Sequence, residues 1–162
     1  MAAFMHLIVH SVVKIMAFFC AGSVLHYAHR EYVSELEGLG KRMPLTFACF
    51  TAAACALTGI PPFNGFVSKW YIGLAAVGEG SVASCLGFAA ILISALLTAI
   101  YMFQVVIKAW FPTEGTLLPT EQDAHEAGGF MTVPMLILAA LCLLMGLFPD
   151  VLLSAIREAV IL

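Results

Sequence analysis

The fold is decided by residues 57–70, which read Leu57-Thr58-Gly59-Ile60-Pro61-Pro62-Phe63-Asn64-Gly65-Phe66-Val67-Ser68-Lys69-Trp70. This stretch interrupts an apolar run that would otherwise cross a membrane as one helix. Pro61 and Pro62 have no N–H donor, so the carbonyls of Leu57 and Thr58, which a continuous helix would pair with them, are left open. A glycine on either side of the prolines tolerates unusual backbone angles. We therefore predict a helix that is discontinuous at Gly59–Gly65.

The predicted break implies a polar site inside the membrane. Unpaired backbone groups at this depth are tolerated only where protein or a water-filled cavity surrounds them. Lys69 follows in the helix that resumes, and a cation near the positive end of a helix inside a membrane is doubly unfavourable, which indicates a function. Trp70 and Tyr71 are expected to pack around the break. The residues that we assign to the broken-helix site are Thr58, Gly59, Pro61, Pro62, Asn64 and Gly65.

Composition places the chain in a membrane. Of its 162 residues, 62% are apolar and 10% charged, against roughly 45–50% and about 25% in an average soluble domain. The mean hydropathy is +1.03, and all ten acidic residues lie in expected loops or near segment ends. The fold class is therefore an all-α integral membrane protein. The net charge of −3 and the scattered basic residues argue against nucleic-acid binding.

Apolar segments predict about four transmembrane helices in a single module that covers residues 1–162. The second span is expected as two half-helices, over about 44–57 and 65–77. Polar residues in 28–42 and 113–129 predict two connecting loops, the second a solvated connector. The expected spans are residues 2–27, 44–79 with the break, 82–110 and 130–148, followed by an amphipathic tail at 151–162.

The basic residues also predict an orientation. Arg30, Lys41, Arg42 and Lys108 fall on one side of the predicted spans, and Arg157 falls on the other. Cytoplasmic loops carry an excess of Lys and Arg. We therefore expect a multi-pass protein of the cell (inner) membrane with loop 28–42 in the cytoplasm and both termini outside.

The first span carries a line of titratable side chains. His6, His10 and Lys14 are spaced four residues apart and lie on one stripe of a helix, with about 6 Å of rise between neighbours. Histidine changes charge near neutral pH and a desolvated lysine can release its proton, so the line, with Lys69, has the parts of a proton relay. The alternatives are hydrogen bonds to neighbouring helices with a snorkelling Lys14, and a metal site at the two histidines. A face of the third span fits either a hydrated path or helix-to-helix hydrogen bonds, and carries Ser94, Thr98, Tyr101 and Gln104.

Other chemistry is not indicated by the sequence. The five cysteines form no CxxC pair, which favours core packing over disulfides or metal binding. No nucleophile–base pair, phosphate loop or cofactor motif occurs. We therefore expect no catalytic residue, no metal and no cofactor, and any enzymatic role would be that of a subunit of a proton-translocating oxidoreductase.

Several motifs, in their order and spacing, resemble the antiporter-like membrane subunits. That family includes the large membrane subunits of respiratory complex I, the subunits A and D of Mrp-type cation/proton antiporters, and membrane-bound hydrogenases. The resemblance covers about residues 1–110. The matching residues are His6-x3-His10-x3-Lys14, Cys20-Ala21-Gly22-Ser23, Gly38-Leu39-Gly40-Lys41-Arg42-Met43-Pro44 and Gly59-Ile60-Pro61-Pro62-Phe63-Asn64-Gly65-Phe66-Val67-Ser68-Lys69.

The resemblance implies a role for each lysine. Family members have about fourteen helices with two inverted repeats, each containing a broken helix, and this chain is similar to the last four. Lys14, with His6 and His10, then corresponds to the central relay, and Lys69 to the lysine of the second repeat's broken helix. The first repeat and its glutamate have no counterpart here, so a partner chain is expected to supply them.

The expected function is proton, or sodium/proton, translocation within a multisubunit membrane complex of the respiratory NADH dehydrogenase, Mrp antiporter or membrane hydrogenase type. Four helices cannot enclose a two-sided channel, so an autonomous transporter is not expected. The alternative is a non-conducting structural or assembly subunit, or a truncated fragment of a larger subunit. The expected partners are other membrane subunits, the lipid bilayer, and protons or sodium ions.

Overall fold

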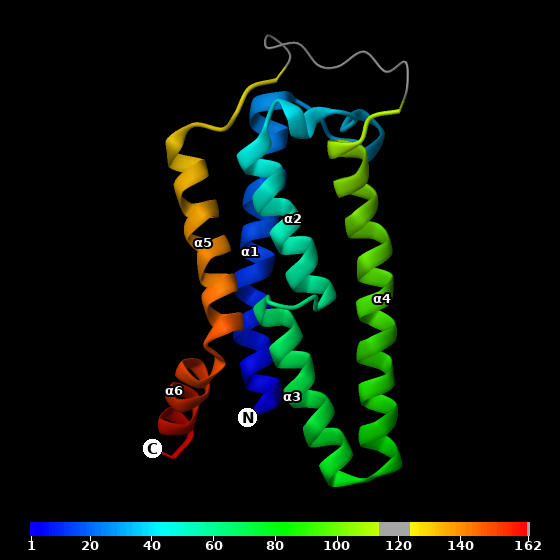
Figure 1. Cartoon of the computed structure of the whole chain (residues 1–162), viewed down its shortest axis with the longest axis vertical. Helices are drawn as coiled ribbons and strands as arrows, with labels where there is room; N and C mark the ends of the chain where they lie inside the picture. The colour runs from blue at the N-terminus through cyan, green and yellow to red at the C-terminus, as the bar shows by residue number, and fades with distance from the viewer. Residues whose placement is uncertain (114–123, 162) are drawn as a thin grey trace.

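The structure is a computed structural model that describes residues 1–113 and 124–161, and these residues are arranged as a bundle of helices (Figure 1). Two short 3₁₀ turns, Val33–Glu35 and Leu39–Lys41, lie in the first loop. The α-helices of the described residues are α1 (Ala2–Ala28), α2 (Pro44–Thr58), α3 (Asn64–Glu79), α4 (Val82–Trp110), α5 (Gly129–Leu147) and α6 (Pro149–Ile161).

About four crossings are confirmed. In the described residues, α1, α4 and α5 are each long and apolar enough to span a bilayer. Helices α2 and α3 have 15 and 16 residues, which gives each a length of about 24 Å, short of a hydrocarbon core of about 30 Å. They follow one another end to end and make the remaining crossing together (Figure 1).

The break is shorter than predicted at its second end. Helix α2 ends at Thr58 and α3 begins at Asn64, so Gly65 lies inside α3 rather than in the break. Only the two proline positions lack N–H donors, and the Phe63 N–H already donates to the Ile60 carbonyl at 3.1 Å. The helical ladder can therefore restart as soon as the prolines are passed.

The C-terminal helix is longer than the predicted tail. Pro149 is the first residue of α6, whereas the sequence suggested that the helical tail starts at Val151. Proline suits the first helical turn because its missing N–H would be unpaired there in any case. The buried side chains of α6, Leu153 and Ile156, pack against Met5 and Val9 near the start of α1.

Helix α1 lies at the centre of the bundle and contacts α2, α3, α5 and α6. Its buried apolar residues recur every three or four positions, as expected for one face of a helix. In α2 the buried Ala53, Ala54 and Ala56 allow neighbouring helices to approach closely. The cysteines are free, and Cys20, Cys49 and Cys142 are buried in one apolar cluster. The buried apolar residues of α1 are Met5, Val9, Val13, Met16, Cys20, Val24 and Ala28.

The two ends of the bundle carry different segments. The 28–42 loop, the end of α4 and the start of α5 lie at one end, and the N-terminus, the α3–α4 turn and α6 lie at the other (Figure 1). The four basic residues that were counted on one side of the predicted spans therefore lie at the same end of the bundle. Of the predicted connector at 113–129, residues 114–123 lie outside the described part of the chain.

Candidate functional site

The break is closed by a glycine and leaves two carbonyls available. Gly59 adopts the left-handed conformation with φ of 93°, and its N–H and that of Ile60 both donate to the Cys55 carbonyl, at 3.0 and 2.9 Å. This pattern satisfies one carbonyl near the end of α2. The carbonyls of Leu57 and Thr58 are open to another donor, as the proline positions predict.

Lys69 supplies that donor. Its Nζ donates to the Thr58 carbonyl at 3.0 Å and also to the Leu57 carbonyl. The ammonium therefore lies at the C-terminal end of α2, where the helix dipole is negative, and this offsets the unfavourable N-terminal end of its own helix. Lys69, for which the sequence offers no partner, is thus paired with the open carbonyls of the break.

Three glycines allow close contacts around the break, one with the side chain of Lys69 and two between backbones. A Cβ atom at Gly59 would lie 3.1 Å from Cδ of Lys69, and one at Gly65 would lie 1.7 Å from the Ala56 carbonyl oxygen. A Cβ at Gly146 of α5 would lie 2.0 Å from the Pro62 carbonyl oxygen. Sequence reasoning identified the first two glycines and missed Gly146, whose only signal is a small residue within the bulky run 143–148.

Two side-chain oxygens at the break have no hydrogen-bond partner in the described protein. Asn64 is fully buried, and its Oδ1, like Oγ1 of Thr58, accepts no hydrogen bond from the protein. Its Nδ2 lies 4.0 Å from Sδ of Met145 in α5. Buried oxygens of this kind are where ordered water binds in proteins.

The histidine line is attached to α3 through a serine. Nδ1 of His6 lies 2.9 Å from Oγ of Ser68, and that hydroxyl donates to the Gly65 carbonyl at 3.1 Å. The rings of His6 and His10 follow, with centroids 5.7 Å apart. Ser68 was missed by sequence reasoning, although a polar residue directly before an intramembrane lysine is a signal.

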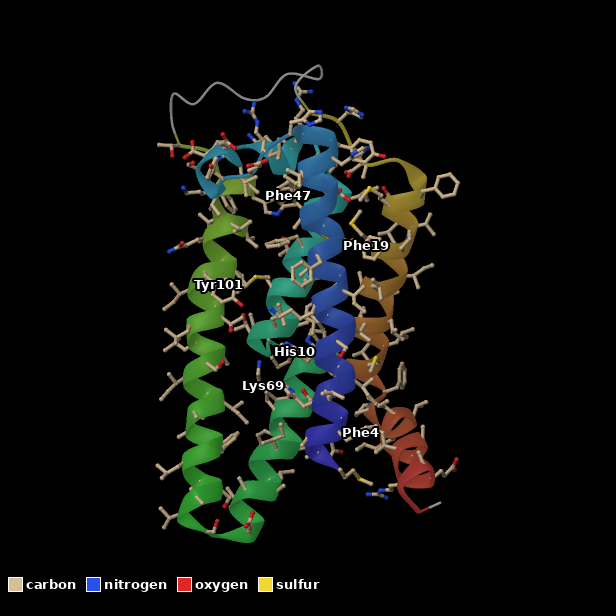
Figure 2. The ribbon with its side chains drawn as sticks, turned by 180° about the vertical axis from the view of Figure 1, so that it is seen from behind. Phe4, His10, Phe19, Phe47, Lys69 and Tyr101 are labelled. Atoms are coloured by element: carbon tan, nitrogen blue, oxygen red, sulfur yellow. The ribbon has the colours of Figure 1, made fainter. Side chains whose placement is uncertain are left out.

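A polar cavity brings the predicted relay residues together. It has a volume of about 300 Å³ and lies between α1, α3 and α4. Figure 2 shows His10 and Lys69 near mid-height of the bundle, between these helices, with Tyr101 on α4 above them. Gln104, which was expected to share a polar face with Ser94, Thr98 and Tyr101, is exposed and does not line the cavity. The polar side chains of the lining are His6, His10, Lys14, Lys69, Ser94, Thr98 and Tyr101.

Trp70 does not pack around the break. It is 57% exposed and stacks on Phe66 with ring centroids 6.0 Å apart, on the outer side of α3. The reason is helical phase, because successive residues of a helix point about 100° apart and Lys69 already takes the inward direction. Tyr71 packs against the apolar cluster that α1 forms with α6.

The histidines do not form part of a larger metal-binding cluster in the described residues. Within residues 1–113 and 124–161, no three His, Cys, Asp or Glu side chains are grouped so that they could hold a metal ion. His6, His10, Lys14 and Lys69 each carry a group that can bind and release a proton.

A discontinuous helix whose open carbonyls bind a lysine, beside a polar cavity that reaches a second lysine, defines an antiporter-like membrane subunit. Residues 1–98 match the family described as NADH:quinone oxidoreductase/Mrp antiporter, TM. The chain belongs to this family.

Relatives and solved structures agree with this assignment. The chain is 36% identical to NADH-quinone oxidoreductase subunit N of Desulforudis audaxviator, over 96% of this chain and 32% of that protein. It is 40% identical to NADH-quinone oxidoreductase subunit L of Mycobacterium tuberculosis, over 85% of this chain and 22% of that protein. It superposes with a TM-score of 0.79 at 26% identity on a chain of the Mrp complex from a Dietzia species, covering 94% of this chain and 35% of that one. On a chain of an archaeal membrane-bound sulfane sulfur reductase it superposes with a TM-score of 0.72 at 26% identity. That superposition covers 90% of this chain and 23% of the reductase chain. The chain thus spans about a third or less of these proteins.

Proposed function

We propose that the chain forms the exit half of a proton path in a multisubunit membrane complex. The observation that carries the proposal is Lys69, which binds the open carbonyls of the broken helix and faces the same cavity as His6, His10 and Lys14. Its relatives are named as subunits of NADH-quinone oxidoreductases, and a structural neighbour is part of an Mrp complex.

The proposed path runs from Lys14 through His10 and His6 to Lys69. The ring centroids of His6 and His10 are 5.7 Å apart, and in the proposal a water molecule bridges the two rings. The cavity of about 300 Å³ has room for several waters. Ser68 fixes His6 next to Lys69, and the two carbonyls stabilise the ammonium form of Lys69 until a proton leaves.

The complex supplies what the described chain does not. Redox chemistry or an opposing sodium gradient elsewhere provides the driving force, and a membrane subunit supplies the first repeat with its carboxylate. In the proposed orientation the 28–42 loop faces the cytoplasm and both termini lie outside, in agreement with the positive-inside rule. No cofactor binds to this chain in the proposal.

The test is lysine substitution in the whole complex, reconstituted into vesicles. Lys69→Ala and Lys14→Ala are expected to abolish most coupled proton translocation, whereas Lys108→Ala is the matched control because Lys108 lies in the last turn of α4, outside the cavity. The amount of intact complex is measured alongside by native gel. If both cavity variants assemble and translocate normally, the chain is a structural subunit or a fragment of one, and the proposal is wrong.

A further inference from the structure

A second cavity lies directly beyond the relay cavity. It has a volume of about 350 Å³ and is lined by the start of α1, the end of α3 and the start of α4. These segments lie at the end of the bundle that carries the N-terminus and the α3–α4 turn (Figure 1). The break and the relay cavity are at mid-height, so the second cavity occupies the space between them and that end.

One residue separates the two cavities. Ile91 of α4 lines both the relay cavity and the second cavity. One turn nearer the end of the bundle, the ring of Phe88 packs on Gly73 of α3, where a Cβ would lie 2.7 Å from Cζ of Phe88. On the α4 side, the boundary between the two cavities is therefore formed by two apolar side chains, Ile91 and Phe88.

The second cavity, which we call the outer cavity from here on, ends at a carboxylate. Glu79, the last residue of α3, lines it and is exposed, and among the described residues it is the one acidic side chain in the lining of either cavity. Ser84 lies beside it, and its hydroxyl donates to the Ala76 carbonyl at 3.1 Å, which holds the two helix ends together. The remainder of the lining is small or apolar.

We propose that the outer cavity is the exit vestibule of the path, that Ile91 and Phe88 are its gate, and that Glu79 is the last proton acceptor before bulk water. This inference rests on the proposed function. The Lys69 ammonium releases a proton to a cavity water and becomes neutral, the proton crosses the gate on water to the Glu79 carboxylate, and Glu79 passes it to the outside. Lys69 regains its charge from the histidine line.

A gate is needed at this place for a physical reason. A continuously wet passage from the relay to the outside would let protons return down their gradient, while an apolar constriction excludes water except when the helices part. The contact of Phe88 with Gly73 is one that a small shift of α4 against α3 would open. The position of the gate, between a charged cavity and a carboxylate, is where such control is effective.

The first experiment measures whether water reaches the outer cavity. Cys85 is exposed and would itself react, so the complex first carries Cys85→Ser. One cysteine is then added in each variant, at Gly87 or at Leu86. A Cβ at Gly87 meets no atom within 4 Å and the residue lines the cavity, whereas the neighbouring Leu86 is 66% exposed and lines neither cavity. A charged thiosulfonate added from outside reacts only with a hydrated thiolate, so Gly87→Cys is expected to react at least about tenfold faster than Leu86→Cys.

The second experiment tests the gate and the acceptor. Ile91→Ala is expected to speed the passive collapse of an imposed pH gradient in vesicles by several-fold, while Leu92→Ala, a neighbour that lines neither cavity, leaves it unchanged. Glu79→Gln is expected to lower coupled translocation several-fold without reducing the amount of assembled complex.

The outcomes separate the two proposals. If Lys69→Ala abolishes translocation but Gly87→Cys reacts no faster than Leu86→Cys and Ile91→Ala causes no leak, the exit vestibule is wrong and the proposed function stands. If Lys69→Ala leaves translocation intact, the proposed function fails, and the vestibule fails with it. Fast labelling, a leak in Ile91→Ala and loss of translocation in Lys69→Ala together support both.

Discussion

At the scale of single residues, Gly65 determines how closely the two half-helices meet. In Gly65→Ala the added Cβ would lie 1.7 Å from the Ala56 carbonyl oxygen, so the backbones must separate, at a cost of about 1–3 kcal/mol in the free energy of unfolding. The shift would also withdraw Lys69 from its carbonyls. Gly78→Ala is the control on the same helix, because a Cβ there meets nothing within 4 Å, and it should be neutral or slightly stabilising. Thermal unfolding of the purified complex compares the two, and equal melting temperatures would contradict this account of the break.

The sequence reveals single residues better than the pairs they form. The open carbonyls of Leu57 and Thr58 follow from two proline positions, and the unfavourable place of Lys69 follows from its helix. That these two anomalies satisfy each other depends on the turn that brings the start of α3 back to the end of α2. This geometry is tertiary, and no local pattern encodes it. The bond between His6 and Ser68, 62 residues apart, is unpredictable for the same reason.

At the scale of elements, a carboxylate from the last connector stabilises the start of α2. Glu126 accepts the Leu45 N–H at 2.7 Å, the Thr46 N–H at 3.3 Å and the Thr46 hydroxyl. A carboxylate at a helix N-terminus satisfies unpaired donors and complements the helix dipole. Glu126→Ala should therefore cost about 1–2 kcal/mol and speed hydrogen exchange of the first amides of α2. Glu158→Ala, at an exposed position of α6, is the control. Unchanged exchange at Leu45 and Thr46 would show that the contact does not hold the helix start.

Hydropathy predicts the helices well and the connectors poorly. The bounds of α1, α4 and α5 lie within about two residues of the predicted spans, because long apolar runs and their polar ends are strong signals. The prediction of a solvated connector missed the role of Glu126, since a polar loop residue carries no mark of the helix that it will cap. The same limit applies to Gly146, whose closeness to the break depends on the packing of α5.

At the scale of the whole molecule, the approximate number of crossings follows from the sequence, but the role of each molecular surface does not. The spacing of apolar residues and the positions of charged residues show which side of a helix faces inward. They do not distinguish a face that contacts lipid from one that contacts another protein. The structure adds this information, because His10 and Tyr101 line a polar cavity and are nevertheless exposed in the isolated chain.

Tyr101 should therefore contact a partner subunit rather than lipid. Polar groups at membrane depth are almost always covered by protein or face a hydrated cavity, and a cavity open on one side needs another chain to close it. A photo-crosslinking residue at Tyr101, which is 49% exposed, is expected to capture another membrane subunit of the complex, as identified by mass spectrometry. Ile137 of α5 is the control, since it is 60% exposed at a similar depth and lies outside the polar cavity. Equal capture at both positions, or none at Tyr101, would mean that the relay cavity is not closed by a partner, and a path through it would then lack the wall that keeps protons from the lipid.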